Sequence, residues 1–197
     1  MVFEDRISKG RPFHQTVIGL MYYNGLGVPK DYKKAMDWYL KAAKQGYAEA
    51  QCLLGMLYED GEGVPQDYQK AMECYLVAVK AGNATAQCNL GMLIHNGHGT
   101  PKDCREAMGW LMEAAGQDHA RAQFNIGVMY QGGDGVAQDY EEAMKWFKKA
   151  ANQGDARGEF NVGVMYHAGR GVRQSAREPW SGIRRPPTKD TFSPSAP

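Results

Sequence analysis

The sequence has little that would support catalysis. No serine occurs between Ser8 and Ser175, so the central part of the chain contains no serine nucleophile. The cysteines form no C-x-x-C pair, which argues against zinc modules and dithiol redox motifs. His95 and His98 have a spacing that can bind a metal, but the sequence places no third ligand beside them. We therefore expect no catalytic residue, no metal site and no cofactor.

Long apolar runs and basic stripes are also absent. No stretch approaches the roughly 20 consecutive apolar residues that cross a bilayer, and residues 1–10 lack the apolar segment of a secretory signal. Residues 12–163 carry 14 Lys and Arg against 18 Asp and Glu, an acidic balance that argues against general nucleic-acid binding. We expect a cytoplasmic protein that does not insert directly into membranes and does not bind nucleic acid.

What the chain does contain is a repeat with a period of 36 residues. The segment Gly19-Leu-Met-Tyr-Tyr-Asn-Gly-Leu-Gly-Val has counterparts that begin at Gly55, Gly91, Gly127 and Gly163. A unit of this length can form two short helices, but it cannot bury its own apolar face, so neighbouring units must stack. The repeat predicts an all-α fold, an α/α superhelical solenoid of helical hairpins.

The second unit shows how each hairpin is built. Residues 48–58 form the predicted first helix and residues 67–80 the predicted second helix. Glycines in the loop over residues 61–66 favour positive φ, and Pro65 disfavours a helical conformation of the residue before it, so the chain turns back. Because the glycine-rich loops follow a helix rather than a strand, they do not match a dinucleotide-binding motif. An aspartate before each second helix can accept backbone N–H groups of its first turn. These aspartates are Asp31, Asp67, Asp103 and Asp139.

Two features of the repeat call for a packing explanation. A glycine inside each first helix costs about 0.5–1 kcal/mol relative to alanine. We attribute it to close approach of the second helix, which offers a small alanine at Ala35 and its counterparts. Asp118 replaces the glycine that closes the second helix in the other units, and we expect this turn to be strained or reshaped.

The cysteines occupy packing positions of the repeat. Cys74, for example, lies where two later units have Trp110 and Trp146. We expect all the cysteines to be buried small apolar residues. They are Cys52, Cys74, Cys88 and Cys104.

The recurring pattern A-x-A-Q-x-x-L-G-x-M-Y-x-x-G-x-G-V-x-x-D-Y-x-x-A-M-x-W resembles the Sel1-like repeat, a relative of the tetratricopeptide repeat. It is clearest in residues 48–82 and 120–154, and the resemblance covers about residues 12–172. The resemblance implies an α/α superhelix that scaffolds protein complexes, and it does not identify the partner.

The register divides the chain into a partial leading segment, the solenoid and a tail. The last unit is a half unit, because Pro179 interrupts the region where a second helix would follow. Its apolar edge is expected to self-associate or to fray. The tail is basic and rich in proline, which predicts disorder. The leading segment is 1–11, the units are 12–47, 48–83, 84–119, 120–155 and 156–172, and the tail is 173–197.

One face of the first helix differs from unit to unit, whereas the packing face stays the same. Beside it runs a column of asparagines. In the similar tetratricopeptide repeats an asparagine there bonds the main chain of a bound peptide. Alternatively, these asparagines only bond neighbouring helices. We call the candidate partner-binding residues the variable stripe. They are Glu49, Cys52, Met56, Glu59, Asp60, Thr85, Asn89, Met92, His95, Arg121, Asn125, Val128, Gln131, Arg157, Asn161 and His167.

The sequence thus predicts a non-catalytic adaptor or scaffold that binds a protein or peptide segment in the concave groove of the solenoid. An alternative is a regulatory subunit that activates a partner enzyme by docking.

Overall fold

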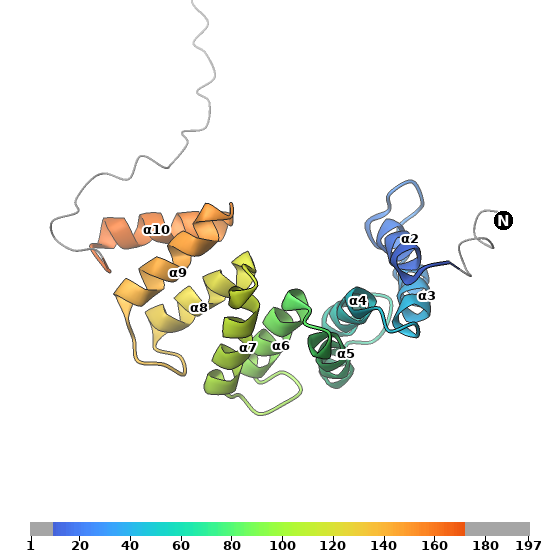
Figure 1. The fold of residues 1–197 in the computed structure, drawn as a ribbon, viewed down its shortest axis with the longest axis horizontal. Coiled ribbons are helices and arrows are strands. Elements are labelled where there is room, and N and C mark those ends of the chain that lie inside the picture. Colours follow the sequence, from blue (N-terminus) through green and yellow to red (C-terminus); the bar gives the residue numbers. More distant parts are fainter. Residues whose placement is uncertain (1–9, 172–197) are drawn as a thin grey trace, which may run out of the picture.

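The computed structural model describes residues 10–171, which form nine helices and no strand. The helices are α2 (Pro12–Asn24), α3 (Tyr32–Ala43), α4 (Ala48–Asp60), α5 (Tyr68–Lys80), α6 (Ala84–Asn96), α7 (Cys104–Gly116), α8 (Ala120–Gly132), α9 (Tyr140–Asn152) and α10 (Ala156–Ala168). Figure 1 shows them following one another along a curved path from α2 to α10. The predicted all-α solenoid is confirmed.

Each unit is a hairpin whose ends are set by glycine and aspartate. The first helix α4 ends at Gly61, which has a φ of 71°. The second helix α5 begins after Asp67, whose Oδ1 accepts the Lys70 N–H at 3.1 Å. The other second helices start in the same way. Repeated turn and capping residues therefore fix the hairpin geometry that the sequence predicts.

The glycine inside the first helix faces an aromatic ring. A Cβ atom on Gly127 would lie 2.6 Å from two ring carbons of Phe147, and one on Gly55 would lie 2.5 Å from the ring of Tyr75. A Cβ on Gly163 in α10 would meet nothing within 4 Å. Close approach of the second helix therefore explains the repeated glycine. The nearest group in these two units is the ring one turn after the repeated alanine, and not the alanine itself.

Two of the four cysteines depart from the expected burial. Cys52 and Cys88 are buried in the core, whereas Cys74 and Cys104 are only partly buried. Cys104 is the first residue of α7, directly after the loop that joins α6 to α7. Cys74 is smaller than the tryptophan that other units have at this position and lines an open surface cavity.

A glutamine pair joins the two helices in most units. The side-chain amide near the end of the second helix donates to a glutamine of the first helix at 2.7–2.8 Å. The second unit has Ala81 instead of the donor, so its Gln51 lacks this bond. The bonds run from Gln45 to Gln15, from Gln117 to Gln87 and from Gln153 to Gln123.

The turn at Asp118 is unusual in backbone conformation. Asp118 has a φ of 58°, while Gly82 and Gly154 at the same repeat position have φ of 77° and 81°. Asp118 therefore adopts a left-handed conformation that favours glycine.

Some predictions concern residues outside the described range. The leading segment lies almost entirely in residues 1–9, and the tail lies in residues 172–197. None of the helices between residues 10 and 171 is long and apolar enough to cross a membrane.

Candidate protein-interaction surface

The variable stripe lies on the first helices, and two of its residues contact residues that cap the first helix of the next unit. Thr85 Oγ1 on α6 lies 3.4 Å from Nε2 of His119, the residue that caps α8. Glu49 Oε2 on α4 accepts from the side-chain amide of Asn83, which caps α6, at 2.9 Å. These contacts join α4 to α6 and α6 to α8.

An apolar column runs through this surface. Met56 and Met92 are half-buried, and Val128 and Val164 at the same repeat position are 39% and 41% exposed. Met56 and Met92 pack partly against the core, so the apolar surface that a partner segment can bury at this repeat position is largest on α8 and α10.

Charge changes sign along the same surface. The first helix α4 carries Glu49, Glu59 and Asp60, and α8 and α10 carry Arg121 and Arg157. Arg157 is paired with Asp155, which caps α10, so the surface is acidic near α4 and carries an exposed guanidinium at Arg121 on α8.

Glu59 is held in place by its own unit. The Tyr75 hydroxyl donates to Glu59 Oε2 at 2.6 Å. Burial raises the pKa of Glu59 above its ordinary value of 4.5, and the hydrogen bond from Tyr75 opposes this shift. Burial is the larger effect, so the pKa of Glu59 is higher in the folded chain than in the unfolded chain.

Three members of the stripe do not reach the surface. Cys52 is 1% exposed, Asn89 is 3% exposed and Asn125 is 9% exposed. Adjacent first helices cover these positions, so a partner cannot contact them in this conformation. The expectation that they take part in a partner-facing stripe is corrected by this burial.

The buried asparagines bond neighbouring first helices. Arg121 Nη1 on α8 donates to Asn89 Oδ1 on α6 at 3.0 Å. Asn125 Nδ2 lies 3.8 Å from Cys88 Sγ on α6. These contacts match the alternative reading of the asparagine column, in which the amides join helices. Asn161 instead donates to a carbonyl of its own helix at 2.9 Å.

The remaining members of the stripe lie toward the C-terminal ends of the first helices. His95 Nε2 lies 3.5 Å from a carboxylate oxygen of Asp134 in the next unit. Gln131 is half-buried, and His167 is exposed. Across residues 10–171, no group of three or more His, Cys, Asp and Glu side chains is placed to hold a metal ion.

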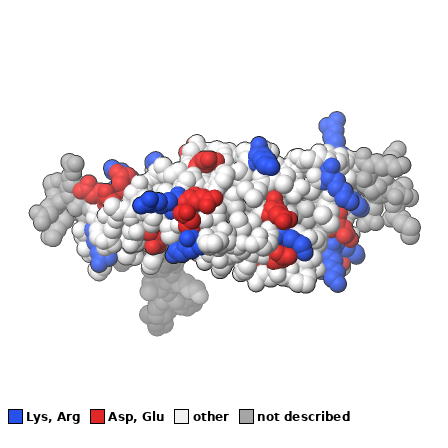
Figure 2. Space-filling model, turned by 90° about the horizontal axis from the view of Figure 1, so that it is seen from below, with Lys and Arg blue, Asp and Glu red and all other residues white. Residues whose placement is uncertain are grey.

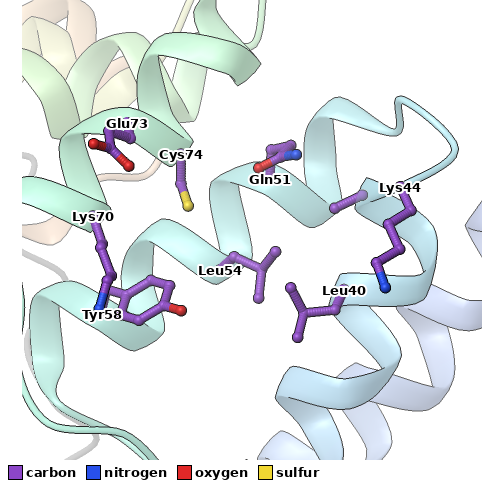
Figure 3. Close-up of a pocket in the computed structure, with 9 residues that line it drawn as sticks. Leu40, Lys44, Gln51, Leu54, Tyr58, Lys70, Glu73 and Cys74 are labelled. Atoms are coloured by element: carbon purple, nitrogen blue, oxygen red, sulfur yellow. The ribbon is translucent and has the colours of Figure 1, made fainter.

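A surface cavity that the sequence did not predict lies outside the variable stripe. A cavity of about 280 Å³ opens between α3, α4 and α5, away from the variable stripe (Figure 3). The signal for it was present, because Cys74 replaces a repeated tryptophan. Figure 2 shows another face of the solenoid, where acidic and basic side chains are interspersed.

The Sel1 repeat matches residues 15–47, 48–83, 84–119, 120–155 and 156–178. This chain belongs to the Sel1 repeat family. Sel1 repeat proteins are generally protein-interaction scaffolds, and their fold is typically non-catalytic. No curated protein matches the chain.

Solved structures of Sel1 repeat proteins resemble the chain along most of its length. A Sel1 repeat protein from Oxalobacter formigenes is 36% identical, with a TM-score of 0.74, over 83% of this chain and 65% of that one. A protective antigen of uropathogenic Escherichia coli strains is 34% identical, with a TM-score of 0.76, over 85% of this chain and 36% of that one. Cysteine-rich protein B from Helicobacter pylori is 25% identical, with a TM-score of 0.53, over 67% of this chain. The chain thus spans less than two thirds of the length of the first two.

Proposed function

We propose that this Sel1 repeat chain is an adaptor or scaffold that holds a protein or peptide segment along the exposed part of the variable stripe. The observation that carries the proposal is the apolar column of Met56, Met92, Val128 and Val164, which runs across successive first helices. Packing positions are alike in every unit, whereas the exposed stripe positions differ. A surface that varies while its scaffold repeats suits recognition of one partner.

The charges on the surface suggest the chemistry of that partner. A bound segment places apolar side chains along the column, basic residues near α4 and an acidic residue near Arg121 on α8. Exposed charge pairs contribute roughly 0–1 kcal/mol each. The charges therefore set the orientation of the segment, and the apolar column supplies most of the affinity.

Peptide selection on the full chain tests this proposal. A displayed peptide library is selected for binders, and the affinity of a synthetic binder is measured by calorimetry. Val128→Glu, which puts a charge on the apolar column, is expected to weaken binding at least about tenfold, equal to about 1.4 kcal/mol.

The matched control is Met112→Glu on the second helix α7, where the side chain is 44% exposed. Met112→Glu is expected to leave the affinity unchanged. Binders that tolerate Val128→Glu and lose affinity with Met112→Glu would contradict the proposed surface.

A further inference from the structure

The second unit differs from the others on the side of the second helices. It has Cys74 where the third and fourth units have Trp110 and Trp146, and Ala81 where the other units have the glutamine donor. Cys74 lines the cavity beside α3, and Ala81 leaves Gln51, which lines the same cavity, without the usual donor. The second unit therefore lacks a large aromatic side chain and a hydrogen-bond donor at one place.

The cavity lies at that place. Leu40 from α3, Leu54 from α4 and Cys74 from α5 form its apolar wall, and Lys44 and Glu73 lie at its rim (Figure 3). We call this cavity the notch. Its volume of about 280 Å³ is just below the usual range for small-molecule pockets, about 300–1,000 Å³, and so suits a single large side chain.

The chain fills the equivalent places with its own tryptophans. Trp146 on α9 packs against the core cluster to which α7 and α8 contribute, just as Cys74 on α5 packs against the cluster of α3 and α4. Lys149 Nζ lies 3.8 Å from the centre of the Trp146 ring. Trp110 Nε1 donates to Glu106 Oε1 at 3.4 Å. These two contacts come from the tryptophan's own helix, and the second unit has Val77 and Lys70 at the corresponding repeat positions.

The notch has a lysine and a carboxylate of its own, from other positions of the repeat. Lys44 brings an ammonium group to the rim, where it can lie over an aromatic ring. Glu73 brings a carboxylate that can accept an indole N–H. The side chain of Gln51, which also lines the notch, has no hydrogen-bond partner among residues 10–171, since Ala81 replaces the usual donor.

The thiol in the notch is not a reactive group. Burial, followed by the charge of Glu73, raises the pKa of Cys74 to about 11. The side chain is therefore a neutral thiol near neutral pH and behaves as an apolar wall. Val77, one helical turn after Cys74 on α5, is 47% exposed.

We infer that the notch is a docking site for a tryptophan side chain of a partner protein, which supplies the indole that the second unit lacks. The indole ring lies between Leu40, Leu54 and Cys74, with its N–H directed at Glu73. The partner's main chain beside that tryptophan bonds the Gln51 amide. The notch lies between α3, α4 and α5 and includes no residue of the variable stripe, so it does not depend on the proposed function.

The probe for this site is N-acetyl-tryptophanamide, titrated into the full chain and followed by two-dimensional amide NMR. We expect millimolar binding, with shift changes confined to the amides around the notch. N-acetyl-leucinamide should bind at least about fivefold more weakly, because it lacks the ring. A probe methylated on the indole nitrogen should also bind several-fold more weakly, because it cannot donate to Glu73.

Cys74→Trp gives the second test, because it supplies the missing indole within the chain. It is expected to abolish probe binding and to raise Tm by about 2–4 °C as the cavity fills. The matched control Cys74→Ala leaves the notch open and should retain binding.

Several outcomes would overturn the inference. Probe shifts spread over the whole chain, or equal binding to Cys74→Trp, would show that the notch is not the site. A Cys74→Trp variant that melts below Cys74→Ala would show that the cavity does not fit an indole. Binding that appears only in the full chain carrying Trp180→Ala would assign the notch to this chain's own Trp180 and overturn the assignment to a partner.

Discussion

Replacing Gly127 by alanine tests how the hairpins are packed. An added Cβ would lie 2.6 Å from the Phe147 ring, a distance at which one of the two groups must move. Phe147 is 0% exposed and contacts Phe124 with ring centres 5.7 Å apart, so the ring has little room to shift. Overpacking of this kind costs about 1–3 kcal/mol. Because alanine favours the helix more than glycine does, the substitution also stabilises the helix by at most about 1 kcal/mol.

We therefore expect Gly127→Ala to lower the free energy of unfolding by about 0–2 kcal/mol and Tm by up to about 8 °C. Gly163 is the matched control, since it occupies the same repeat position and an added Cβ there meets nothing within 4 Å. Gly163→Ala should therefore gain about 0.5–1 kcal/mol from helix propensity alone. Thermal melts followed by circular dichroism compare the two variants directly.

A third variant tests the cause of the loss. Gly91, at the same position, faces Leu111, whose Cγ would lie 3.1 Å from an added Cβ. Combining Gly127→Ala with Phe147→Leu reproduces that looser arrangement and should make the added methyl group less costly than it is opposite phenylalanine. If Gly127→Ala proves as stable as Gly163→Ala, close approach of the ring is not the reason for the repeated glycine.

Three further substitutions have defined expectations. Tyr75→Phe should lower the free energy of unfolding by about 1.5–3 kcal/mol in denaturant titrations, because it removes the hydrogen bond to the half-buried Glu59 carboxylate. Tyr39→Phe, its control, should be neutral or slightly stabilising, because the Tyr39 hydroxyl is buried and has no hydrogen-bond partner among residues 10–171; equal losses would refute this. Burial lowers the pKa of His119 below 6.5, and its Nδ1 accepts the first-turn N–H of α8. The unfolded chain therefore binds the proton more readily than the folded chain does. Stability should consequently fall as pH drops below about 6.5. Replacing His119 by asparagine, the residue type that caps α6, should remove this fall in stability. Urea midpoints measured at about pH 7.5 and about pH 5 check this, and an unchanged fall would assign it to other groups. Asp118→Gly should raise stability by about 1 kcal/mol by relieving the left-handed turn, and a lower Tm would contradict that reasoning.

The repeat made the hairpins predictable from the sequence. The four complete units carry the same local signals, such as Gly61 after the first helix and Asp67 before the second, so each unit supports the same structural prediction. Local signals also flagged Asp118, which departs from the repeat and adopts a positive φ.

The exposure of the stripe was less predictable, because it depends on how closely neighbouring first helices approach. Helical periodicity assigns Cys52 and Met56 to one stripe, yet the structure buries the first and leaves the second half-exposed. Likewise, register located Cys74 at a tryptophan position, but only the spacing of α3 and α5 shows that the substitution leaves a cavity.

Site-specific photo-crosslinking tests the central claim most directly. A benzophenone amino acid is placed at Val128 on α8, or at Met112 on α7 as a control of similar exposure, in the cells that produce the protein. Crosslinked partner segments are then mapped by mass spectrometry. The scaffold proposal predicts that Val128 crosslinks a defined segment of one protein, that the synthetic segment competes with it, and that Met112 does not capture it. Capture of the same segment from Met112 with none from Val128 would show that the variable stripe is not the binding surface.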